Sequence, residues 1–147
     1  MNKVILGNVG HGMFIGLLNY SNGRCSYLQI DCASKEETYA RFYSILKRVS
    51  IAPFPFLLSH FHYDHYSGLT KAYKRHDKFN IDTFYFPRMP KIVGVDSMEL
   101  LRLTLFFESV YAFTKTGLPI IDLIQLVEDV SFNCGISIHP LSSGDVF

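Results

Sequence analysis

The sequence predicts a mixed α/β fold, in which one β-sheet has antiparallel and parallel strands and carries its helices on one face. The chain opens with three short apolar segments, and the second and third are joined by Asn22-Gly23, a dipeptide typical of tight hairpins. Beyond residue 34, segments with helix and strand periodicity alternate. This order is typical of layered α/β proteins.

The expected elements follow from periodicity and from their boundary residues. Ser34 stands three residues before Glu37, and Asp96 stands three before Glu99, a spacing typical of helix starts. Gly117-Leu118-Pro119 predicts a helix end. The expected helices are 34–49, 67–74, 97–116 and 119–128, and the expected strands are 4–9, 13–20, 25–30, 54–58, 81–86 and 135–139.

Length and composition indicate one cytoplasmic domain. The chain has 147 residues, 48% of them hydrophobic, and a formal charge of +1, which excludes a broad basic groove for nucleic acid. Three cysteines without metal-type spacing favour a reducing compartment, and no signal peptide is recognisable at the N-terminus. The apolar segment 97–116 contains three charged residues, which predicts a buried helix and no membrane span.

A cluster of three imidazoles and a carboxylate, at His60, His62, Asp64 and His65, follows the apolar run 54–58. These donors suit zinc, iron or manganese. Residues two apart in an extended segment project to one side, so His60 and His62 can hold one ion, while Asp64 and His65 can hold a second. Two ions lower the pKa of a bridging water and make hydroxide available near neutral pH. Accidental histidines and a single structural ion are the alternatives, although structural sites favour cysteine.

The pattern His60-x-His62-x-Asp64-His65, followed by Ser67-Gly68-Leu69, resembles the signature of the metallo-β-lactamase superfamily. Asp31, at the end of the third strand, agrees with it, and the segment 8–12 resembles the start of the DNA-uptake-protein-like branch. The resemblance implies an αββα sandwich. It also implies that His60 and His62 bind the first metal, that Asp64 and His65 bind the second, that Asp64 orients the hydroxide in catalysis, and that Asp31 holds the histidine loop.

The chain departs from the family pattern after its first half. The family's domain usually exceeds about 200 residues, so residues 1–147 would form one incomplete domain, its first half to two-thirds, truncated at the C-terminus. His139 is a further candidate metal ligand, although a strand-end histidine is the favoured interpretation. Asp145 is interpreted as a turn residue, and Met13 stands where the DNA-uptake-like branch has an acidic residue.

Two functional hypotheses follow. The first is a metal-dependent hydrolase that uses metal-bound hydroxide, holds one or two zinc ions (iron or manganese being alternatives), and prefers a small-molecule or nucleic-acid phosphodiester over thioester or other acyl substrates. The second is a noncatalytic, truncated module of the same fold that binds a partner. The aromatics Phe106, Phe107, Tyr111 and Phe113 recur on one predicted helix and are expected to belong to the core. If the second half of the domain is absent, part of this surface would be exposed, and a homo-oligomer or a partner chain would then complete the fold.

Overall fold

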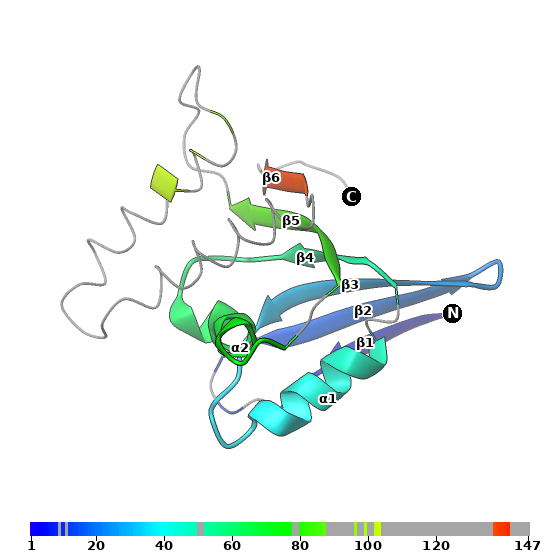
Figure 1. Cartoon of the computed structure of the whole chain (residues 1–147). Helices are drawn as coiled ribbons and strands as arrows, with labels where there is room; N and C mark the ends of the chain where they lie inside the picture. The colour runs from blue at the N-terminus through cyan, green and yellow to red at the C-terminus, as the bar shows by residue number, and fades with distance from the viewer. Residues whose placement is uncertain are drawn as a thin grey trace.

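The computed structural model describes residues 1–8, 10, 12–49, 52–77, 80–87, 96, 99, 102–103 and 137–141. These residues contain one six-stranded sheet, whose strands lie side by side in chain order, and two helices (Figure 1). The strands are β1 (Asn2–Leu6), β2 (Phe14–Ser21), β3 (Arg24–Cys32), β4 (Phe54–Leu57), β5 (Ile81–Pro87) and β6 (Ser137–Leu141). The helices are α1 (Tyr39–Val49) and α2 (Tyr63–Lys74).

The sheet is mixed, as the sequence predicted. Strands β1, β2 and β3 pair antiparallel, whereas β3, β4, β5 and β6 pair parallel. Both helices lie on the same face of the sheet (Figure 1). The predicted α/β class, with a mixed sheet and its helices on one face, is therefore confirmed.

The predicted hairpin joins β2 to β3 through Asn22 and Gly23. Their φ angles are +50° and +74°, so both residues adopt the left-handed conformation that a two-residue primed turn requires. Ser21 pairs with Arg24 directly across this turn. The two-residue turn therefore sets the register of both strands. This register matters because shifting the pairing by one residue would exchange the buried and exposed faces of a strand.

The hydrophobic core lies between the sheet and the two helices. Alternate strand residues face the same side, and those that face the helices are mainly aromatic. Phe42 of α1 packs edge-on against Phe14 of β2, with ring centroids 5.5 Å apart, and Phe56 stacks on Phe84 at 5.3 Å. The strands contribute Phe14, Leu18, Tyr27, Phe54, Phe56, Phe84 and Phe86 to this core.

Helix α1 ends at Val49, as predicted, but the predicted start at Ser34 is wrong. The helix begins at Tyr39. The Ser34 hydroxyl donates to the carbonyl of Lys35 at 2.9 Å, and the Lys35 N–H donates to Thr38 Oγ1 at 3.1 Å. Side-chain hydrogen bonds of this local kind stabilise a turn in place of the first helical turn.

Helix α2 begins at Tyr63, four residues earlier than predicted, so Asp64 and His65 lie in its first turn and not in a loop. The His65 N–H donates to the carbonyl of His62 at 2.9 Å, which starts the helix. Farther along, Glu99 N donates to Asp96 Oδ1 at 2.8 Å, the hydrogen bond expected of a helix start.

The last described strand, β6, overlaps the predicted strand 135–139. It extends through Pro140, which pairs with Phe86 of β5 and was expected to follow the strand. Most of the predicted helix 97–116 and all of the predicted helix 119–128 lie outside the described residues, as do His11 of the segment 8–12, Asp145 and the four aromatics between 106 and 113. Within the described part, no helix has the length and apolar character needed to cross a membrane.

Candidate metal centre

The histidine cluster lies at the carboxyl end of β4, beside the carboxyl end of β3. These two strands are parallel, and Ile30 is in register with Leu57. Asp31 therefore comes directly after the last pairing of β3 with β4, next to the segment Leu58-Ser59-His60. Functional sites collect at the carboxyl ends of neighbouring parallel strands, because the loops there converge on one edge of the sheet.

Asp31 connects β3 to the histidine loop and to α2. Its side chain is 1% exposed. Oδ1 accepts a hydrogen bond from the Ser59 N–H at 2.8 Å, and Oδ2 accepts one from the Ser59 hydroxyl at 2.6 Å. Oδ2 also lies 2.7 Å from His65 Nδ1. A buried carboxylate with three such partners fixes their positions firmly, since hydrogen bonds to an ionised group are the stronger kind.

A buried glutamine holds the backbone of Asp31, which has a φ of +51°. Gln29 is fully buried, and its Nε2 donates to the Asp31 carbonyl at 2.5 Å and to the Ile15 carbonyl at 3.2 Å. The Tyr27 hydroxyl donates to Gln29 Oε1. Gln29 was not among the residues predicted from the sequence. Its signal is the spacing, because Tyr27, Gln29 and Asp31 alternate along β3 and so share the helix-covered face.

The three histidine rings of the cluster lie together. The ring centroids of His60 and His62 are 4.6 Å apart, and those of His60 and His65 are 3.6 Å apart. Asp64 is on the margin, with Oδ1 3.9 Å from His65 Nε2 and a half-exposed side chain. The structure thus brings the predicted residues of the two ion sites into one group, in which His60 lies closer to His65 than to His62.

The surroundings of His60 favour its neutral form. Burial lowers the pKa of His60, and the neighbouring rings of His65 and His62 lower it further, against a smaller opposing effect of Asp31 and Asp64. A neutral imidazole has one ring nitrogen with a free lone pair. These surroundings therefore favour the protonation state that metal coordination requires.

The backbone just before β2, at Gly12 and Met13, packs against the first turn of α2 and is called the glycine loop. The Met13 N–H donates to the Asp64 carbonyl at 3.2 Å, and the Ala33 N–H donates to the Met13 carbonyl at 2.8 Å. Gly12 has a φ of +95°, and a Cβ placed on it would lie 1.9 Å from the Asp64 carbonyl oxygen. This close approach requires glycine, so the loop fixes the backbone that carries Asp64 and His65.

The donor atoms fit a metal ion in type, because the imidazoles and the carboxylate suit zinc. His65 also fits in orientation, since the contact of its Nδ1 with Asp31 leaves Nε2 free to bind an ion. However, no group of three or more His, Cys, Asp or Glu side chains among the described residues is arranged so that it could hold an ion. An ion at this place would need the donors to rotate, or a donor from another part of the chain.

His139 lies apart from the cluster in sequence and in the sheet. It is an exposed residue of β6, in register with Tyr85, and its ring centroid is 5.7 Å from that of Tyr85. Strand β5 separates β6 from β4. His139 was favoured as a strand histidine, and its role as a ligand stays a prediction.

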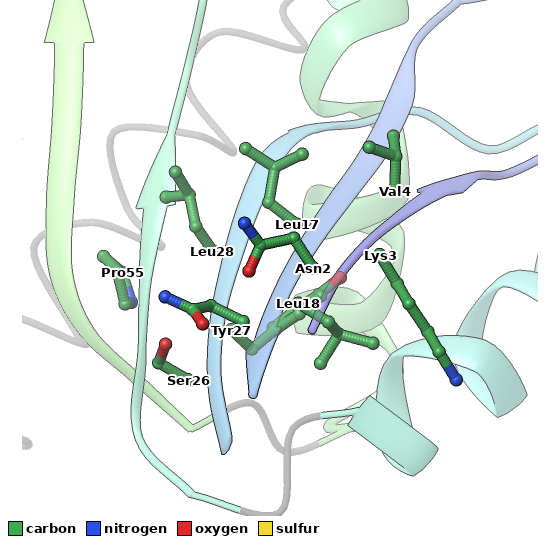
Figure 2. A pocket seen from close by; sticks show the side chains of 10 residues that line it. Asn2, Lys3, Val4, Leu17, Leu18, Ser26, Tyr27, Leu28 and Pro55 are labelled. Carbon is green, nitrogen blue, oxygen red and sulfur yellow. The ribbon is translucent and has the colours of Figure 1, made fainter. Parts of the chain in front are cut away.

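A cavity of 440 Å³ lies elsewhere on the sheet, and Figure 2 shows the side chains that line it. Val4, Leu17, Leu28 and Pro55 give it a mainly apolar wall. The cavity lies toward the amino ends of β3 and β4, whereas the histidines follow the carboxyl end of β4. None of the cluster residues lines it, so it is not a substrate pocket for chemistry at the histidines.

Comparison with known proteins gives a structural likeness. No family model matches the chain, and no curated protein matches it. The crystal structure of a β-lactamase domain protein from Burkholderia ambifaria is similar over 99% of this chain and 42% of its own length, with 16% sequence identity and a TM-score of 0.47. The chain therefore spans less than half of that protein. At this TM-score the likeness is a partial resemblance of architecture and carries no argument about activity or ligands.

Proposed function

We propose that this chain is a metal-dependent hydrolase, or the metal-binding part of one. The observation that carries the proposal is the hydrogen-bonded group in which Asp31 holds Ser59 and His65, while the ring of His60 lies against the rings of His65 and His62. A buried carboxylate that orients an imidazole is the usual support of a metal-binding histidine.

In this proposal His60 and His62 hold a first ion, and Asp64 and His65 hold a second. Zinc is the preferred metal, and iron and manganese are alternatives. A bound ion of this kind would lower the pKa of water and supply hydroxide near neutral pH. The residues of the chain would orient the reaction: Asp64 would accept a hydrogen bond from the attacking water, and Asp31 would keep His65 in place.

The preferred substrate class is a phosphodiester, on a small molecule or a nucleic acid, ahead of thioesters and other acyl compounds. This preference rests on the resemblance of the segment 8–12 to the DNA-uptake-protein-like branch. We further propose a cytoplasmic location, because Cys25 and Cys32 are free thiols and a reducing compartment keeps thiols free.

The second candidate function is a noncatalytic module of the same fold that binds a partner chain or a second copy. The donor count favours it. His60 with His62, and Asp64 with His65, give only two protein ligands for each ion, whereas catalytic zinc sites usually have three. In this case a partner chain would supply the remaining donors.

Metal content measured by plasma mass spectrometry tests the first proposal. The full chain would be purified, loaded with zinc and dialysed, beside the double variant His60→Ala/His62→Ala. His76→Asn is a matched control, because it removes an exposed imidazole from α2's distal end. His76 has a φ of +56°, and asparagine tolerates that conformation better than alanine does.

We expect one or two zinc ions per chain in the wild type and in His76→Asn, and a loss of at least one ion in the double variant. Turnover of bis(p-nitrophenyl) phosphate, an activated phosphodiester, should disappear with the metal, and an activated thioester assayed beside it would rank the substrate classes. Turnover that survives the double substitution would exclude this site as its source. A wild-type chain without bound metal would favour the partner-binding module.

A further inference from the structure

The Ser59 hydroxyl lies between the buried carboxylate and two histidines. Its Oγ is 2.6 Å from Asp31 Oδ2, 3.0 Å from His60 Nδ1 and 3.2 Å from His65 Nδ1. The Ser59 backbone N–H independently holds Asp31 Oδ1 at 2.8 Å, so the peptide keeps its place without the side chain. Ser59 therefore connects Asp31 to His60 by hydrogen bonds.

The number of protons at this junction decides which group donates. A hydroxyl has one proton and two lone pairs, whereas an ionised carboxylate only accepts. Two oxygens 2.6 Å apart need a proton between them, and between Ser59 and Asp31 only the hydroxyl can supply it. The Ser59 hydroxyl therefore donates its proton to Asp31, and the lone pairs of Ser59 Oγ remain free to accept hydrogen bonds.

His60 then has one favourable tautomer. Since Ser59 Oγ can only accept from it, the His60 Nδ1 must carry the proton and donate across the 3.0 Å contact. In a neutral imidazole this leaves the lone pair on Nε2. The same holds for His65, whose Nδ1 donates directly to Asp31 Oδ2 at 2.7 Å.

We propose that Ser59 is a positioning residue that links Asp31 to His60 through two hydrogen bonds. These bonds hold His60 in the tautomer with a proton on Nδ1 and a free lone pair on Nε2. One carboxylate thereby orients two imidazoles, His65 directly and His60 through the hydroxyl. The consequence for metal binding rests on the proposed function, whereas the tautomer itself does not.

Nitrogen-15 NMR of the metal-free, full-length chain tests this, because long-range proton–nitrogen spectra distinguish the two ring nitrogens of a neutral histidine. Spectra would be recorded near pH 8, above the ordinary imidazole pKa of about 6.5. Ser59→Ala removes the hydroxyl and Ser59→Thr retains it. Ser44→Ala, on the exposed surface of α1, is the control for removal of a serine hydroxyl far from the site.

In the wild type, Ser44→Ala and Ser59→Thr, we expect His60 to carry its proton on Nδ1. In Ser59→Ala, His60 should become a mixture of tautomers, while His65 keeps Nδ1 protonated because Asp31 still accepts from it. A merely structural role of Ser59 would move both histidines or neither. An unchanged His60 tautomer in Ser59→Ala, in a chain that remains folded by circular dichroism, would overturn the proposal.

Zinc titration of the same four proteins by calorimetry separates this proposal from the proposed function. Loss of a supporting hydrogen bond should weaken zinc binding by roughly tenfold or more in Ser59→Ala, with recovery in Ser59→Thr. If the wild type binds no zinc but the His60 tautomer changes as expected, the role of Ser59 stands and the proposed hydrolase fails. If zinc binds equally to all four proteins and the tautomer does not change, Ser59 has no positioning role.

Discussion

Gly12→Ala should destabilise the protein by pushing the glycine loop away from the first turn of α2. The added Cβ would lie 1.9 Å from the Asp64 carbonyl oxygen, 2.8 Å from the Asp64 carbonyl carbon and 2.6 Å from the Ala33 Cβ. A carbon–oxygen contact normally measures about 3.3–3.6 Å, so the backbone would have to separate by about 1.5 Å. The backbone atoms of a packed helix cannot yield as a flexible side chain can.

Two free-energy costs add up in Gly12→Ala. Holding alanine at a φ of +95° costs about 1–2 kcal/mol, and overpacking costs about 1–3 kcal/mol. The lower conformational entropy of alanine in the unfolded chain offsets about 0.4–1 kcal/mol. The expected net loss in the free energy of unfolding is therefore about 1–5 kcal/mol.

Gly23→Ala separates the two costs. Gly23 also has a positive φ, +74°, but a Cβ there would meet no atom within 4 Å. Urea unfolding followed by circular dichroism should therefore show a loss of about 1 kcal/mol for Gly23→Ala and at least about 1 kcal/mol more for Gly12→Ala. Equal losses in the two variants would refute the contact between the loop and α2. Amide shifts of Asp64 and His65 should move only in Gly12→Ala.

Two further substitutions test the support of the site. Asp31→Asn replaces an acceptor oxygen with a donor, so at least one of the three hydrogen-bond donors that face the carboxylate loses its partner. We expect the free energy of unfolding to fall by about 1–3 kcal/mol in urea unfolding, while the exposed Asp82→Asn should change it little. Gly68→Ala would bring a Cβ to 2.6 Å from the Cys32 carbonyl oxygen and to 3.0 Å from the Phe42 ring. The melting temperature should therefore fall, although alanine favours a helix more than glycine does. A rise in the melting temperature would show that α2 is packed less tightly than described.

Local sequence was sufficient for the hairpin of β2 and β3 and for the place of the cluster, although it placed the first strand at 4–9 whereas β1 spans Asn2–Leu6. Asn22-Gly23 predicted the hairpin because few other dipeptides tolerate two consecutive left-handed residues. The apolar run before His60 predicted strand β4, and the alternation beyond it predicted the mixed order. These features are encoded by neighbouring residues, so periodicity and turn chemistry reveal them.

Helix boundaries were harder to predict from the sequence. Ser34 has the residue type of a helix start, yet its side chain bonds within a turn and α1 begins at Tyr39. Helix α2 starts inside the histidine cluster, at Tyr63. In both cases side-chain and loop contacts compete with the helix's own first turn, and a pattern of residue types does not show which set of hydrogen bonds is more favourable.

Residue types and their spacing along the chain were enough to indicate which chemistry the site could hold: three imidazoles and a carboxylate lie within six residues, and an aspartate stands at a strand end. The arrangement of these groups in space comes from tertiary packing. The parallel pairing of β3 and β4 brings Asp31 beside Ser59, a separation of 28 residues, and the docking of α2 brings His65 against His60. Ser59 acquires its role through such contacts, since a hydrogen bond between distant residues depends on the packing of whole strands and helices and leaves no periodic trace in the sequence.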